Sequence, residues 1–143
     1  MPSASRQPRT PPVAAPYAVS FRADDLRHLR HAVAGWAARA GLRGQRAADF
    51  VIAVHEIATN AIRHGSPVAR LALQIAGTAT QAEVRDGGHW PLEPLAATAP
   101  AGLGMGLYVV RQVCDQVTIH RGATGSTVTL QMNLPDRPLP ARG

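Results

Sequence analysis

Residues 55–65 read HEIATNAIRHG, and the apolar residues in and before this segment recur at helical spacing. At about 3.6 residues per turn they form one stripe about 140° wide, which is typical of a helix that buries one face. The stripe consists of Phe50, Val51, Val54, Ile57, Ala58, Ala61 and Ile62. Gly65 favours a helix end, because glycine is common just after the last helical residue. We therefore expect a helix from about Arg46 to His64.

The rest of this helix surface carries Glu56, Asn60, Arg63 and His64. A solvated helix face has a similar composition, and that interpretation stays open. Two features favour a site: asparagine is unfavourable inside helices, and Glu56 is the only acid after the first turn of the helix. A carboxylate and an amide oxygen one turn apart suit Mg²⁺ or a water bound to it. The zinc-protease helix is excluded, because its second histidine would fall at Thr59.

Further elements predict the fold class. Apolar alternation and helical spacing indicate strands at 17–21, 69–76, 79–85, 117–121 and 126–134 and helices at 26–40 and 104–113. Asp24 or Asp25 is the expected cap of the first helix. This order predicts an α+β fold, a two-layer sandwich with a mostly antiparallel sheet and helices on one face.

The domain organisation follows from composition. Residues 1–16 and 135–143 are rich in proline and poor in apolar side chains, so they are expected to be disordered tails around one domain at 17–134. Residues 87–103 lack periodicity and contain three prolines, which favours a long functional loop, here a lid.

The chain has no lysine, so all 15 residues in the combined lysine and arginine count are arginine. This excludes Walker-type phosphate loops, kinases of the eukaryotic type and Schiff-base enzymes. The net charge is +6, yet the arginines are scattered, so direct contact with nucleic acid is not expected. No apolar run reaches the roughly 18–20 residues of a membrane span, and the single Cys114 cannot form an internal disulfide. We expect a cytoplasmic protein with no membrane partner.

Two glycine-rich segments are candidate ligand sites. Residues 84–88 read VRDGG, where Asp86 follows a strand and glycines allow a flat ligand to approach the backbone. Residues 102–107 read GLGMGL and lead into an apolar helix, whose free N–H groups can bind phosphate without lysine. A simple turn at the first segment and a flexible hinge at the second remain alternatives.

The order of these motifs, with GSTV at 125–128, resembles the N, G1, G2 and G3 boxes of the histidine-kinase-like ATPase (GHKL) superfamily over about residues 17–134. That resemblance implies the Bergerat-type ATP-binding fold. The short chain and the pattern E-x-x-x-N-A-x-x-H-G resemble the bacterial anti-sigma-factor serine/threonine kinases. Such proteins bind a sigma factor and phosphorylate an anti-anti-sigma (STAS-type) partner. Two features depart from the family pattern, namely His89-Trp90 and the proline- and alanine-rich lid.

The resemblance implies ATP and Mg²⁺ as cofactors, with Glu56 as the catalytic base or water-positioning group and Asn60 as the Mg²⁺ ligand. Residues implied near the phosphates are Arg63, His64, Gly102, Gly104, Met105, Gly106 and Leu107. Those implied at the adenine are Asp86, Gly88, Ser126 and Thr127. Arg30 corresponds to a partner-contacting arginine, and a homodimer is also implied.

Two other functions remain open at this stage. One is a nucleotide-binding module without catalysis that sequesters a sigma factor or another regulator. The other is a nucleic-acid contact through the basic charge, which would show as a steep loss of affinity with salt.

Overall fold

The computed structural model describes residues 14–64, 66–88 and 104–135. The elements in chain order are β1 (Tyr17–Phe21), a 3-10 turn η2 (Ala23–Asp25), α1 (Leu26–Ala40), α2 (Gly44–His64), β2 (Ala69–Ala76), β3 (Ala79–Asp86), α4 (Gly104–Val113), β4 (Gln116–Gly122) and β5 (Gly125–Asn133). Each expected helix and strand is present, with bounds that differ by at most two residues. The expected lid and most of both expected tails lie outside the described residues.

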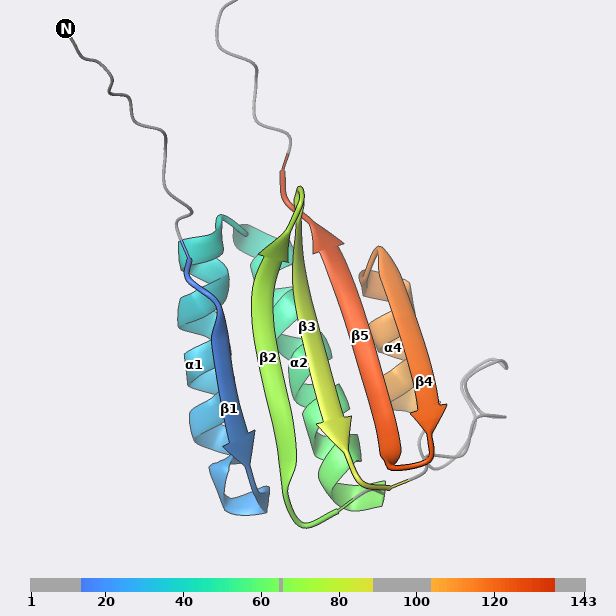
Figure 1. The fold of residues 1–143 in the computed structure, drawn as a ribbon. Coiled ribbons are helices and arrows are strands. Elements are labelled where there is room, and N and C mark those ends of the chain that lie inside the picture. Colours follow the sequence, from blue (N-terminus) through green and yellow to red (C-terminus); the bar gives the residue numbers. More distant parts are fainter. Residues whose placement is uncertain (1–13, 65, 89–103, 136–143) are drawn as a thin grey trace, which may run out of the picture.

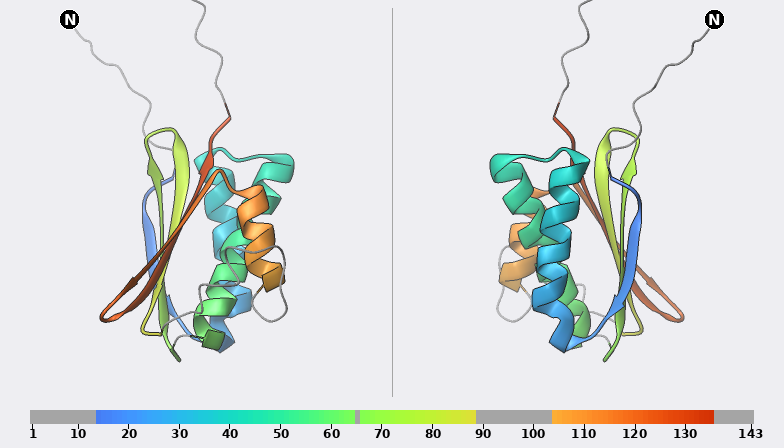
Figure 2. Two further views of the ribbon diagram at one scale, coloured as in Figure 1. Left: turned by 90° about the vertical axis from the view of Figure 1, so that its right-hand side faces the viewer. Right: turned by 90° about the vertical axis from the view of Figure 1, so that its left-hand side faces the viewer.

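The five strands form one antiparallel sheet in the order β1-β2-β3-β5-β4. Helices α1, α2 and α4 cover one face of the sheet, and no described element covers the other (Figure 1, Figure 2). The predicted α+β sandwich, a mostly antiparallel sheet with helices on one face, is therefore confirmed.

The core lies between the helices and the inner face of the sheet. Alternate residues of the central strands point into it, as the period of two in a strand requires. Buried inward residues include Leu71, Leu73, Ala82, Val84, Val128, Leu130 and Met132. From the helices come the residues of the predicted stripe, of which Val51 and Ile62 are only partly buried.

The N-terminal end of the described chain also reaches the core. Ala14 is 4% exposed, and the Trp36 Nε1–H group donates a hydrogen bond of 2.8 Å to the Ala15 carbonyl oxygen. Trp36 stacks on Phe50 with ring centroids 6.1 Å apart, which joins α1 to α2. Residues 14–16, assigned to the tail by composition, thus contact α1 because a buried indole N–H needs an acceptor.

The first helix begins differently from the expectation. Asp25 lies at the N-cap position of α1, but its side chain makes no cap hydrogen bond there. Its carboxylate instead accepts a hydrogen bond of 2.9 Å from the Arg22 backbone N–H, which closes the preceding η2 turn. The predicted aspartate cap of α1 is therefore corrected to a cap of the turn before it.

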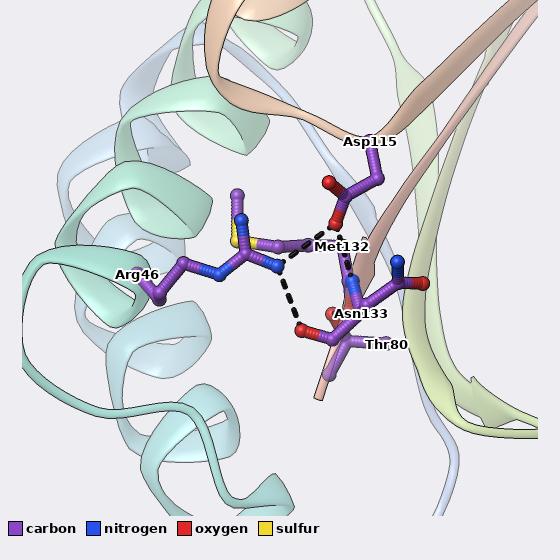
Figure 3. Close-up of polar contacts among 5 residues, drawn as sticks. All are labelled: Arg46, Thr80, Asp115, Met132 and Asn133. Atoms are coloured by element: carbon purple, nitrogen blue, oxygen red, sulfur yellow. Dashed lines mark hydrogen bonds and ion pairs between the residues drawn. The ribbon is translucent and has the colours of Figure 1, made fainter. Parts of the chain in front are cut away.

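The start of α2 is tied to the ends of β5 and α4 (Figure 3). Arg46 Nη2 lies 2.8 Å from Asp115 Oδ2 and 2.8 Å from the Asn133 carbonyl oxygen, while Asn133 N–H donates to Asp115 Oδ2 at 2.7 Å. We call these three residues the Arg46 clasp. Beside it, burial raises the pKa of the Cys114 thiol to about 12, so this cysteine stays a neutral thiol at physiological pH.

No helix in the described ranges is long and apolar enough to cross a membrane.

Candidate functional site

The C-terminal half of α2 holds polar atoms that lack partners. The buried atoms without a hydrogen-bond partner in the described part of the chain are His55 Nδ1, Thr59 Oγ1, Asn60 Nδ2 and His64 Nε2. A buried polar atom without a partner costs about 1–3 kcal/mol. Four such atoms within ten residues therefore indicate that this half of α2 is completed by something outside the described residues.

Asn60 is the most deeply buried of the predicted polar set, with 3% of its surface exposed. The helical wheel assigned it to a polar face, for which a solvated helix surface was one interpretation, yet the side chain is buried. Helix α4 packs against α2 (Figure 2). The burial of Asn60 argues against a solvated helix face at this position and therefore favours a site. Glu56, one turn earlier, is partly exposed.

The end of β3 forms a compact network of hydrogen bonds. Asp86 is 8% exposed, and its Oδ1 atom accepts a 2.6 Å hydrogen bond from the Gly88 N–H. The buried Ser126 hydroxyl donates to the Gly88 carbonyl oxygen at 2.7 Å. The network holds the Asp86 carboxylate and the glycine backbone in a fixed relation, as a site for a flat ligand requires.

Two residues of this network were missed by sequence reasoning. Ser66 Oγ accepts a hydrogen bond from the Gly87 N–H at 3.2 Å and donates to the Val68 carbonyl at 2.6 Å, so it joins the end of α2 to the end of β3. The signal was a serine before proline directly after the helix-ending glycine, a pattern typical of a turn.

The structural role of Gly125 is the second feature that was missed. Its φ of +143° is rare for residues with a side chain, and a Cβ atom there would lie 2.8 Å from the Gly87 Cα. The start of β5 therefore passes so close to the end of β3 that only glycine fits. The GSTV motif at 125–128 includes Gly125, but the motif gives no sign of the close approach to Gly87.

Helix α4 begins at the predicted glycine-rich segment. Gly104, Met105 and Gly106 form its first turn, and Leu107 is 2% exposed in the core. The first backbone N–H groups of a helix have no partner within the helix, so this end can receive an anion. Gly102 lies outside the described residues.

The structure turns one of the predicted residues, Thr127, away from this group. Thr127 faces the opposite side of the sheet from Ser126, because successive residues of a strand alternate. Arg63 is exposed near the end of α2. The residues that do lie at one end of the fold belong to the end of α2, the end of β3 and the start of β5 (Figure 1).

Arg30 on α1 is exposed and close enough to act on His55 of α2. Burial, and then the positive charge of Arg30, lowers the pKa of His55, while the Glu56 carboxylate acts in the opposite direction. His55 is therefore held neutral in the α1–α2 interface, as expected of a structural histidine.

The side chains present fit a Mg²⁺ ion whose coordination shell is completed mainly by water and the phosphates of a bound substrate. The described ranges contain no group of three or more histidine, cysteine, aspartate or glutamate side chains that could hold a metal. Mg²⁺ often takes one or two protein oxygens and completes its shell with water and substrate phosphates. Asn60 offers one such oxygen, Oδ1, within an enclosed side chain, while the unpartnered atom of the same amide is its Nδ2 donor.

Comparison with known proteins identifies the family and supports the fold. The model of the histidine kinase-like ATPase domain family matches residues 19–132. No curated protein matches the chain.

Solved structures also match. A structure of the RsbU and RsbW domains of Rv1364c from Mycobacterium tuberculosis is 26% identical, with a TM-score of 0.66, over 87% of this chain and 34% of that one. The chain thus spans about a third of that protein.

The histidine kinase domain of the Erythrobacter litoralis EL346 blue-light activated histidine kinase is 19% identical, with a TM-score of 0.53, over 76% of this chain and 59% of that one. At that identity the likeness concerns the fold alone. The family match covers most of the chain and includes α2, the end of β3 and the start of β5. The chain belongs to the histidine kinase-like ATPase domain family.

Proposed function

We propose that the protein binds ATP with Mg²⁺ and acts as an anti-sigma factor that phosphorylates a serine or threonine of an anti-anti-sigma (STAS-type) partner. Membership of this ATPase family implies ATP binding. The observation that carries the proposal is the enclosed Asn60 side chain, whose Nδ2 donor lacks a partner in the described part of the chain. Asn60 lies in the last turns of α2, and the end of α2 lies at the same end of the fold as the end of β3 (Figure 1).

Each part of the nucleotide has a proposed place. The Asp86 carboxylate accepts a hydrogen bond from the adenine amino group. Gly88 leaves room for the adenine ring, and the Ser126 hydroxyl holds Gly88 in position. Asn60 is the protein ligand of Mg²⁺, which neutralises charge on the phosphates. His64, Arg63 and the first turn of α4 bind the phosphates, since each offers N–H donors.

Glu56 is the proposed catalytic residue. The partner's hydroxyl oxygen attacks the γ-phosphorus, the bond to the bridging oxygen of the β-phosphate breaks, and ADP leaves. Glu56 accepts or orients the hydroxyl proton, and its partly exposed position on α2 leaves it accessible to a partner.

The partner surface is proposed on α1. Arg30 is exposed there, beside the α1–α2 interface, and is the proposed contact with a sigma factor. The similarity to a structure that contains an RsbW domain supports the anti-sigma part of the proposal, as does the motif spacing. We also propose a homodimer, a cytoplasmic location, and one ATPase domain at 17–134 between two tails.

The decisive experiment is incubation of the full chain with radiolabelled ATP, Mg²⁺ and candidate anti-anti-sigma proteins from the same genome. Transfer of label to a serine or threonine of one candidate is the expected result. A partner that binds in a nucleotide-dependent way but never becomes labelled would instead establish the alternative, a switch module without catalysis.

A further inference from the structure

A row of polar side chains crosses the face of the sheet that no described helix covers. The strand register places Ser20 opposite Arg70, Arg70 opposite Arg85, Arg85 opposite Thr127 and Thr127 opposite His120. Side chains directly opposite one another in neighbouring strands point to the same face. The row therefore brings two guanidinium groups and an imidazole from three strands onto one surface.

These side chains line a cavity of about 400 Å³. All five residues of the row contribute to its wall, together with Thr124 and Gly125 of the β4–β5 hairpin. Asp86 and Ser126 also border it, but their side-chain oxygens bond Gly88 and so belong to the Asp86 network. The cavity volume is within the range of small-molecule sites.

The charge in this row is unbalanced. Arg70 and Arg85 are directly opposite, an arrangement that destabilises a sheet when nothing else is bound. Within the described residues Arg70 forms no ion pair, and Arg85 has only a long contact of 3.8 Å to Glu83. The Arg85 side chain is 63% exposed, so this contact is weak.

The neighbouring rows differ in character. The next row along the sheet is Ala18, Ala72, Glu83, Thr129 and Thr118, and the one after it contains Gln74, Gln81, Gln131 and Gln116. Apart from the Glu83 carboxylate, the side chains there are small or carry amides, and they provide neither a large apolar surface nor further positive charge. The positive charge is thus confined to the row that borders the cavity, which favours a compact anion over an extended one.

We propose that this cavity binds a phosphate monoester dianion. Two guanidinium groups on adjacent strands can each donate paired hydrogen bonds to phosphate oxygens. The His120 imidazole and the hydroxyls of Ser20 and Thr127 add donors around the same space. This site lies beyond the proposed nucleotide site and does not depend on it, because its donors face the opposite side of the sheet.

The test is a titration of the ¹⁵N-labelled full chain with inorganic phosphate and with O-phosphoserine at constant ionic strength, followed by NMR of the arginine Nε–H groups. Saturable shifts at Arg70 and Arg85 are expected. Arg70→Gln and Arg85→Gln should each raise the Kd at least about tenfold, the loss of one charge-assisted pair. Arg43→Gln is the matched control, since it removes one exposed arginine outside the cavity and should leave the Kd unchanged.

Unperturbed backbone amide spectra would establish that the variants fold. The inference is overturned if no saturable shift occurs, or if Asn60→Ala abolishes the shifts, since phosphate would then occupy the nucleotide site. It is also overturned if duplex DNA shifts the same signals at far lower concentration than phosphate does. A phosphoserine peptide that binds at least about tenfold tighter than O-phosphoserine would identify a protein-borne phosphate, and equal affinity a free metabolite.

Discussion

The two ends of α2 differ in how their polar groups are satisfied. At its start, Arg46 bonds both Asp115 and the Asn133 carbonyl, and Asp115 also accepts a backbone N–H. At its end, Thr59, Asn60 and His64 bury polar atoms that have no partner in the described ranges. The Arg46 clasp is complete as it stands and serves the fold. The other end is incomplete by itself, and this contrast is the physical reason for placing the nucleotide there.

The largest expected effect is on catalysis at the incomplete end. Glu56→Gln keeps the size of the side chain but removes the proton acceptor, so ATP affinity should stay nearly intact. Phosphotransfer should fall by about 10²–10⁴-fold, the range for a positioned acid-base group. Single-turnover kinetics measure the fall in phosphotransfer, and calorimetry on the same variant measures the affinity for ATP.

Asn60→Ala supplies the comparison for this variant. It removes the proposed Mg²⁺ ligand, so nucleotide binding with Mg²⁺ and phosphotransfer should decline together. Equal phosphotransfer by wild type and Glu56→Gln would remove Glu56 from the chemistry.

A second prediction concerns the close approach of β5 to β3. Gly125→Ala should destabilise the fold by about 3 kcal/mol, because it adds backbone strain at positive φ and a clash with Gly87. Gly77→Ala is the matched control: φ there is +64°, but no atom lies within 4 Å of the added Cβ. Its cost should be about 1 kcal/mol. Urea unfolding of both variants measures the difference, and equal losses would mean that the approach to Gly87 does not matter.

The third prediction tests the proposed adenine contact. Asp86→Asn replaces a carboxylate oxygen by an amide group that can present a donor to the adenine amine. Affinity for ATP and ADP should drop about 10–100-fold, the value of a hydrogen bond to a charged group. Calorimetry with ATP and GTP provides the readout, since loss of the contact should reduce the preference for adenine. Unchanged affinity for ATP would reject Asp86 as the adenine acceptor.

Local pattern was sufficient for the fold but not for the site. The apolar stripe of α2 and the alternation of β2 and β3 are properties of near neighbours in sequence, so the helices, strands and layer arrangement could be predicted. Burial of Asn60 depends on what packs around α2 in the folded chain, and no helical wheel contains that information. The role of Gly125 likewise arises from a contact with the distant Gly87. Thr127 follows the motif, yet its position in the strand turns it to the opposite face.

The smallest expected effect belongs to the Arg46 clasp. The backbone N–H of Asn133, and then Arg46, hold the pKa of Asp115 below its usual range. A carboxyl group with a lowered folded-state pKa stabilises the protein above its unfolded pKa, near 4, and loses that contribution as pH falls through the folded value. Both side chains are more than a third exposed, so the ion pair itself is worth about 0–1 kcal/mol. Asp115→Asn should therefore cost about 1 kcal/mol at pH 7 in urea unfolding, and this cost should shrink as pH falls below about 4 toward the lowered folded-state pKa. A loss that stays constant across this range would mean that Asp115 acts by shape and not by charge, and the contrast between the two ends of α2 would then rest on packing alone.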